Sequence, residues 1–128
     1  MANAQVAITT SIKLSEGVNE VASRAASGSI DLTEHTELFD QVDPSVTDKP
    51  IGLGGLAAFD FLYLETDGDI SIRLGDILNT AISIKAIQSA GGVSKGVFLL
   101  ETDAVDSLFV TNASASNPAR VKYIFGKK

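Results

Sequence analysis

The stretch that most constrains the fold runs from residue 59 to residue 74 and reads FDFLYLETDGDISIRL. Asp67-Gly68 separates two apolar runs, and such a pair is a strong β-hairpin signal because a type I′ turn needs positive φ at both central positions. A turn at these two residues predicts one apolar core face and a second face open to a neighbour. The predicted core face holds Phe59, Phe61, Tyr63, Ile70, Ile72 and Leu74, and the other face holds Leu62, Leu64, Ser71 and Arg73.

Other segments of the chain also alternate apolar and polar residues or form short apolar runs, which predicts strands. Turn residues separate these segments, and no long amphipathic helix is predicted. The predicted segments are 5–14, 18–26 (a strand or one helical turn), 38–42, 81–87, 97–100 (covered on both faces), 105–111 and 121–125. About seven to nine short strands in one chain predict an all-β, antiparallel β-sandwich or a small barrel. We expect a single domain over residues 1–128, with residues 1–14 as an N-terminal arm or edge strand.

Breaks are expected at 15–17, at 27–29, between Pro44 and Pro50, and in the glycine-rich loop 52–55. That loop lacks the spacing and the following Lys-Ser or Lys-Thr of a phosphate-binding loop, so a loop or bulge before a strand is the better interpretation. Leu-Glu-Thr-Asp occurs at 64–67 and again at 100–103, which we interpret as two similar strand ends. Pairing about the second copy would oppose Glu101 and Asp106, so a longer or bulged turn is predicted there.

The charge of the chain argues against a general nucleic-acid binder, because 16 acidic and 10 basic residues give a formal charge of −6. Acidic residues crowd positions 31–48, and the last acid before the basic end is Asp106. A solvated acidic loop and a solvated basic tail are the favoured interpretation, and complementary ends that meet between subunits are the alternative. No secretory signal and no apolar run near the length of a membrane span is found, which predicts a soluble protein without a membrane segment.

Residues that could carry chemistry are few. The absence of cysteine excludes disulfides, thiolate zinc sites and cysteine nucleophiles. The single histidine, His35, lies among acids without a second histidine, so an exposed loop residue is favoured over a metal ligand or general base. Asp60 and Asp76 could form a glycosidase carboxylate pair, but in so acidic a chain such pairs arise by chance. We expect no enzyme activity, no catalytic, cofactor-binding or metal-binding residue, and no cofactor.

Two further patterns have simple structural interpretations. The carboxylates around Gly68 lack the spacing of an EF-hand, and a hairpin tip explains them. Asn112-Ala113-Ser114 matches the glycosylation pattern but is interpreted as part of a turn. The aromatic residues lie mostly at alternating strand positions, so core packing is favoured over a stacking platform.

Three segments together resemble small β-sandwich structural proteins of tailed-bacteriophage virions. They are FLYLETDGDISIRL, GVFLLETDAVDSLFVTNAS and ARVKYIFG, within roughly residues 56 to 126. The resemblance implies a jelly-roll-like fold and a non-enzymatic role, above all that of a capsid decoration or cement protein made in the host cytoplasm and located in the virion. Implied partners are the major capsid protein or other virion proteins and further copies of the chain, without nucleic acid or membrane. The alternatives are a receptor- or glycan-binding module of a tail fibre, and a head-tail or tail component. The candidate contacts to subunits or partners are Leu62, Leu64, Arg73, Arg120, Lys122, Lys127 and Lys128.

Overall fold

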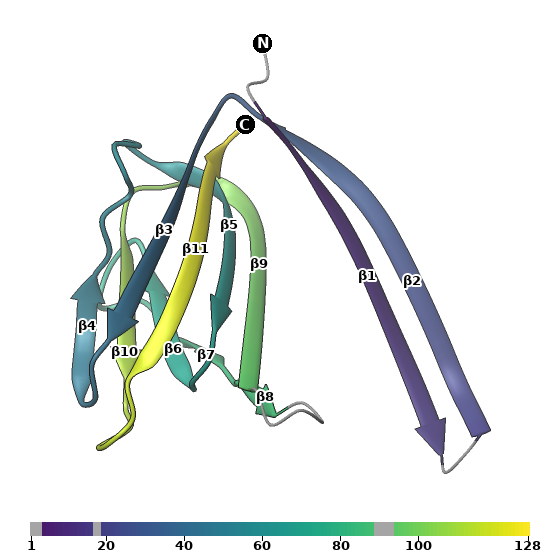
Figure 1. Cartoon of the computed structure of the whole chain (residues 1–128). Coiled ribbons are helices and arrows are strands. Elements are labelled where there is room, and N and C mark those ends of the chain that lie inside the picture. Colours follow the sequence, from purple (N-terminus) through teal and green to yellow (C-terminus); the bar gives the residue numbers. More distant parts are fainter. Residues whose placement is uncertain (1–3, 17–18, 89–93) are drawn as a thin grey trace.

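A computed structural model describes residues 4–16, 19–88 and 94–128, and gives the backbone alone for 10–16, for 19–26 and for 88. The described chain forms a two-stranded, a four-stranded and a five-stranded antiparallel sheet (Figure 1). The two-stranded sheet is a hairpin of β1 (Ala4–Glu16) and β2 (Asn19–Leu32). In spatial order, the five-stranded sheet holds β3 (Glu34–Val42), β11 (Ala119–Lys127), β5 (Phe59–Thr66), β9 (Ser94–Val105) and β8 (Ile87–Gln88). The four-stranded sheet holds β4 (Val46–Pro50), β10 (Leu108–Asn112), β6 (Ile70–Leu74) and β7 (Ile82–Ile84).

The two larger sheets have the strand connections of a jelly roll. β3 pairs with β11, β4 with β10, β5 with β9 and β6 with β7, so each antiparallel pair is nested inside the previous one along the chain. Successive strands β3 to β6 alternate between the two sheets. This winding is that of a double-sheet jelly roll. The predicted all-β, antiparallel, jelly-roll-like sandwich is confirmed, and its four plus five strands lie within the expected range.

The core lies between the two sheets, where one face of each strand is apolar. In β11 the residues at alternate positions from Ala119 to Phe125 are buried. Tyr123 stacks on Phe125 with ring centroids 5.6 Å apart, and Phe125 packs against Phe59 at 5.1 Å. Burial raises the pKa of Tyr123 because a phenolate would be desolvated there.

The predicted hairpin at Asp67-Gly68 is wrong. β5 lies between β11 and β9, whereas β6 lies between β10 and β7, so residues 67–69 cross from one sheet to the other. Neither Asp67 nor Gly68 has positive φ. The turn is tied to β11 instead: the Asp67 carboxylate accepts a hydrogen bond from Arg120 N at 2.7 Å, and Asp67 N donates to Arg120 O at 3.1 Å.

The predicted faces of β5 are also reversed over most of the strand. Leu62 and Leu64, predicted to be open to a neighbour, are 0% exposed in the core, whereas Tyr63 faces outward and is half-buried. A bulge between Phe59 and Phe61 shifts the alternation. Phe59 therefore belongs to the cluster between the sheets, whereas Phe61 is 0% exposed but lies outside that cluster. Leu62 and Leu64 therefore cannot contact another subunit in this fold.

Several strand boundaries differ from the predicted ones. β2 runs through Gly28 without the expected break, and β4 lies inside the segment expected to be irregular. The strand expected over 81–87 is divided between β7 and β8, and β9 is longer than expected, with Val97 and Leu99 exposed on one face. The second Leu-Glu-Thr-Asp lies inside β9, and not at a strand end. The loop at 52–55 is confirmed, with φ of 63° at Gly54 and 95° at Gly55. The predicted turn residue Gly17 lies outside the described residues.

The β1–β2 hairpin, called the arm below, extends away from the sandwich (Figure 1). Its root is held at the end of β11, where Thr33 N and Thr33 Oγ1 both donate to Lys127 O at 2.7 and 3.1 Å. Leu32, the last residue of the arm, is 1% exposed and lies over Gly126. A Cβ at Gly126 would lie 2.6 Å from the Leu32 side chain, so the backbone there gives room to this leucine.

Candidate functional site

The candidate site is the outward side of the five-stranded sheet, called the outer face below. Residues directly opposite each other in neighbouring strands share a face of the sheet. The strand register therefore arranges the side chains of the outer face in rows across β3, β11, β5 and β9. The most exposed large apolar side chains of the rows are Phe39 at 75%, Val97 at 56% and Leu99 at 41%. The rows are Phe39, Lys122, Glu65 and Val97; Glu37, Ile124, Tyr63 and Leu99; and His35, Gly126, Phe61 and Glu101.

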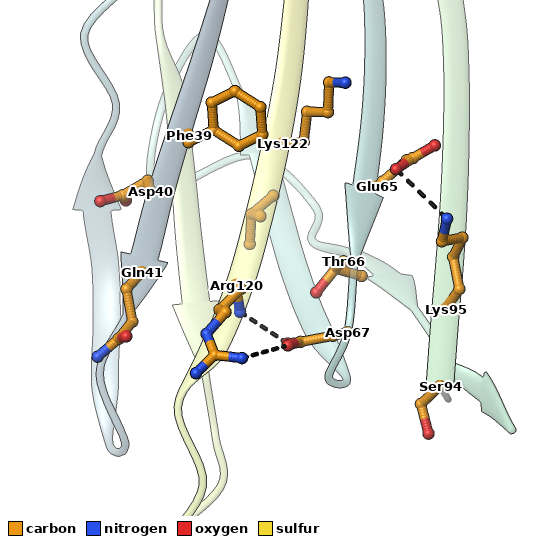
Figure 2. A pocket seen from close by; sticks show the side chains of 11 residues that line it. Phe39, Asp40, Gln41, Glu65, Thr66, Asp67, Ser94, Lys95, Arg120 and Lys122 are labelled. Carbon is orange, nitrogen blue, oxygen red and sulfur yellow. Dashed lines mark hydrogen bonds and ion pairs between the residues drawn. The ribbon is translucent and has the colours of Figure 1, made fainter. Parts of the chain in front are cut away.

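An open cleft of about 530 Å³ lies where β5 ends and β11 begins. Phe39 and Gln41 of β3 line one side, and Ser94 and Lys95 of β9 line the other. Figure 2 shows the Arg120 guanidinium and the Asp67 carboxylate facing each other, with Lys95 pointing toward Glu65. The cleft therefore combines an exposed aromatic ring with charges of both signs.

The charges of the cleft are held in pairs. Lys122 Nζ lies 3.0 Å from a Glu37 oxygen and 5.3 Å from the centroid of the Phe39 ring. The hydrogen bond to Glu37 raises the pKa of Lys122, so this side chain stays charged. Lys95 Nζ lies 3.6 Å from Glu65. Arg120 Nη1 lies 4.0 Å from Asp67, so the basic side chains of the cleft each have an acidic partner.

Tyr63 and Glu65 form a hydrogen-bonded pair in the middle of the outer face, in which a neutral hydroxyl is the donor and a carboxylate is the acceptor. The Tyr63 hydroxyl donates a hydrogen bond to Glu65, which lowers the pKa of that carboxyl, and the charge of Lys95 lowers it further. Burial, the hydrogen bond and the Glu65 charge together raise the pKa of Tyr63 to about 12. Tyr63 therefore stays neutral and Glu65 stays charged across the neutral range.

The candidate contact residues lie in four different places. Arg120 and Lys122 line the cleft. Lys127 and Lys128 lie at the opposite end of β11, where Lys128 Nζ contacts Glu101 at 2.7 Å. Arg73 belongs to the other sheet and pairs with Asp48 at 2.9 Å, and Leu62 and Leu64 are in the core. The structure therefore brings together only the first two of these residues in a cleft.

The acidic and basic ends of the sequence meet within the chain. Acidic β3 is the neighbour of basic β11, and the Glu37 and Lys122 pair joins them. The basic end is a strand inside a sheet, and not a solvated tail. The charge asymmetry therefore stabilises this strand pair and gives no reason to expect complementary ends in different subunits.

The other residues considered for chemistry have structural partners or are exposed. Asp60 accepts a hydrogen bond from Lys128 N at 2.8 Å, and Asp76 accepts one from Leu78 N at 2.9 Å. Asp69 accepts one from Ala86 N at 2.8 Å, and that bond lowers its pKa. His35 is exposed on β3. Within the described ranges, no three histidine, aspartate or glutamate side chains gather into a group that could hold a metal ion.

Asn112 of the glycosylation pattern, predicted to lie in a turn, is the last residue of β10, and its side chain holds the turn that follows. It is 1% exposed, and its amide nitrogen donates to Val42 O at 3.0 Å and to Asn117 O at 2.9 Å. Its amide oxygen accepts from Ser114 N at 3.1 Å. The buried amide thus organises the loop from β10 to β11.

A second hollow, called the arm groove below, was missed from the sequence. It measures about 440 Å³ and lies between the arm and the outer face. Its lining residues are uncharged: Val6, Ala7, Ile8 and Thr9 of β1, and Phe61, Tyr63, Val97, Leu99 and Ile124 of the sheet. The apolar residues on both faces of 59–64 were the available signal, because such runs indicate a strand covered on both sides.

Comparison of the chain with family models, curated proteins and solved structures found no significant match. In the part of the chain that the structure covers, no helix is long and apolar enough to cross a membrane. The outer face must therefore be interpreted from its own chemistry.

Proposed function

We propose that this chain is a non-enzymatic structural protein of a tailed-bacteriophage virion, a capsid decoration protein that binds the major capsid protein and associates with itself. The observation that carries the proposal is the outer face, where Phe39 is 75% exposed beside a cleft of paired charges. An exposed aromatic anchor next to a polar, charged rim is the usual anatomy of a protein interface. Jelly rolls occur in viral capsid proteins, lectins and cupins, so the fold alone does not select this role.

Binding to capsid shells tests the proposal. Purified chain is mixed with shells of the encoding phage that lack it, and co-sedimentation is measured as a function of concentration. Phe39→Ser should weaken binding roughly tenfold or more, as expected for loss of an interface anchor. The matched control is Leu78→Ser, because Leu78 is 88% exposed in the loop after β6 and lines neither hollow. Failure of the wild-type chain to bind shells, together with its absence from purified virions, would contradict the proposal.

A glycan- or receptor-binding module of a tail fibre is the second candidate. The cleft favours it, since an aromatic ring beside carboxylates such as Asp40, Glu65 and Asp67 offers the groups that hold a polar ring-shaped ligand. Binding on a glycan array that is lost in Phe39→Ser would support this candidate, and an array without hits would remove it. A head-tail or tail component is distinguished by the position of the chain in imaged particles.

A further inference from the structure

The arm groove has an unusual wall. Four consecutive residues of β1, from Val6 to Thr9, line it, so both faces of the strand contribute. A strand that lines a hollow with consecutive residues presents its edge, because successive side chains point to opposite faces. The other edge of β1 pairs with β2, and in the described chain no third strand joins this sheet. The groove therefore offers an open strand edge above an apolar sheet face.

Such a groove fits an extended strand. The strand would bond to the free backbone groups of β1 and lay its side chains on Tyr63, Leu99 and Ile124. The arm itself needs such a partner, because a lone two-stranded hairpin is at best marginally stable in water.

The occupant must be uncharged along its length, since the groove residues carry no charge. The edge strands of the described sheets differ in this respect. β2, β3 and β4 carry charged residues, and β7 and β8 span three and two residues. By contrast, residues 4–12 of β1 contain no charge, proline or glycine and no bulge, and so lack the features that keep edge strands from pairing.

We propose that two copies of the chain join through their β1 edges, with β1 of each copy lying in the arm groove of the other. Antiparallel pairing centred near Ile8 is self-complementary, as a twofold interface requires. The first charge, Lys13, lies beyond the uncharged run, so the pairing opposes no like charges. The joined arms form a four-stranded sheet. This inference deepens the self-association part of the proposed function and rests on it.

Sedimentation equilibrium of the full chain tests the pairing with two matched variants. Ala7→Lys with Thr9→Lys places charges on β1 in the groove, where both residues are exposed. The control, Ser27→Lys with Ser29→Lys, places the same charges on the exposed residues directly opposite on β2. The β1 variant should raise the dimer dissociation constant at least about tenfold, and the control less than about twofold. A monomeric wild type, or equal shifts in both variants, would overturn the proposal.

Hydrogen exchange keeps the test decisive if the β1 variant alters the arm itself. In the wild type, amides of residues 5–12 should gain protection as dimer forms, because β1 then has strands on both edges. Dimerisation without added protection in β1 would contradict the pairing. Shell binding separates the two proposals: a wild-type monomer that binds shells contradicts self-association and the arm pairing but not capsid decoration, whereas a dimer that binds no shells contradicts capsid decoration alone.

Discussion

Asn112 shows how one side chain can hold a loop between two strands. Asn112→Ala leaves the carbonyl of Val42 and the amide of Ser114 without their partner in a buried place. We expect the free energy of unfolding to fall by about 2 to 3 kcal/mol, measured by urea denaturation. Asn117→Ala is the control, since Asn117 is exposed and contributes its backbone oxygen, and it should change stability by less than about 0.5 kcal/mol. Equal effects of the two substitutions would show that the buried amide does not organise the loop.

The two tyrosines should resist ionisation while the fold persists. The chain contains only Tyr63 and Tyr123, and the pKa of each is raised above its ordinary value of 10.0. Because the folded pKa of Tyr63 is the higher one, its contribution to stability is complete below pH 10 and is lost as the pH rises toward about 12. Native protein at pH 10 should therefore show almost no phenolate absorbance, and urea-unfolded protein should show about half of the maximum.

Glu65→Gln tests the cause of the shift at Tyr63. The substitution removes the negative charge beside the hydroxyl, so the pKa of Tyr63 should fall although burial still keeps it above the ordinary value. Spectrophotometric titration of Tyr123→Phe, with and without Glu65→Gln, isolates the Tyr63 signal. An unchanged Tyr63 titration in the double variant would exclude Glu65 as a cause.

At the residue scale, the sequence predicted which residues lie in strands better than which of their side chains point into the core. Strand positions of most aromatic residues were correct, but the choice between Tyr63 and Leu64 as core was not. Residues 59–64 are apolar on both faces, so period two cannot select the inward one, and the bulge after Phe59 is invisible in the pattern. Asp67-Gly68 was misleading because the partner of Asp67 is Arg120, 53 positions away.

At the scale of the elements, the attachment of the arm to the sandwich depends on the contact between Leu32 and Gly126. Gly126→Ala places a methyl group 2.6 Å from the Leu32 side chain and should destabilise the fold by about 1 to 3 kcal/mol through overpacking. Combining it with Leu32→Ala should cost less than the sum of the single substitutions, because the leucine is then gone. Urea denaturation measures all three. Gly52→Ala is the control, since a Cβ there meets nothing within 4 Å, and additive costs would contradict the contact.

The sequence could predict the strands of the arm but not how they lie. The alternation over 5–14 predicts the first strand, and the pattern over 18–26 predicts a strand or one helical turn, of which the structure shows the strand from Asn19 onward. The glycine at position 28 suggested a break, but its partner across the hairpin is Ile8 and the strand continues. The cleft could not be predicted from the sequence for a similar reason, because Phe39 and Lys122 meet only where β3 and β11 are neighbours.

For the whole molecule, the nested pairing makes β11 indispensable and the arm dispensable for the sandwich. The core cluster includes Val121, Tyr123 and Phe125 of β11 but no residue of the arm. A chain lacking residues 1–31 should keep a single cooperative unfolding transition, whereas one lacking 119–127 should show none. Circular dichroism during urea titration measures both. A missing transition in the first variant would mean that the arm belongs to the folding unit.

The position of β11 has a consequence for synthesis on the ribosome. This strand lies between β3 and β5, although it is the last of the three to be made. Until residues 119–127 emerge from the exit tunnel, β3 and β5 each lack a neighbour, and the apolar residues between the sheets stay accessible to water. The nascent chain therefore passes through a long interval in which β1 can meet other nascent chains before the jelly roll has closed.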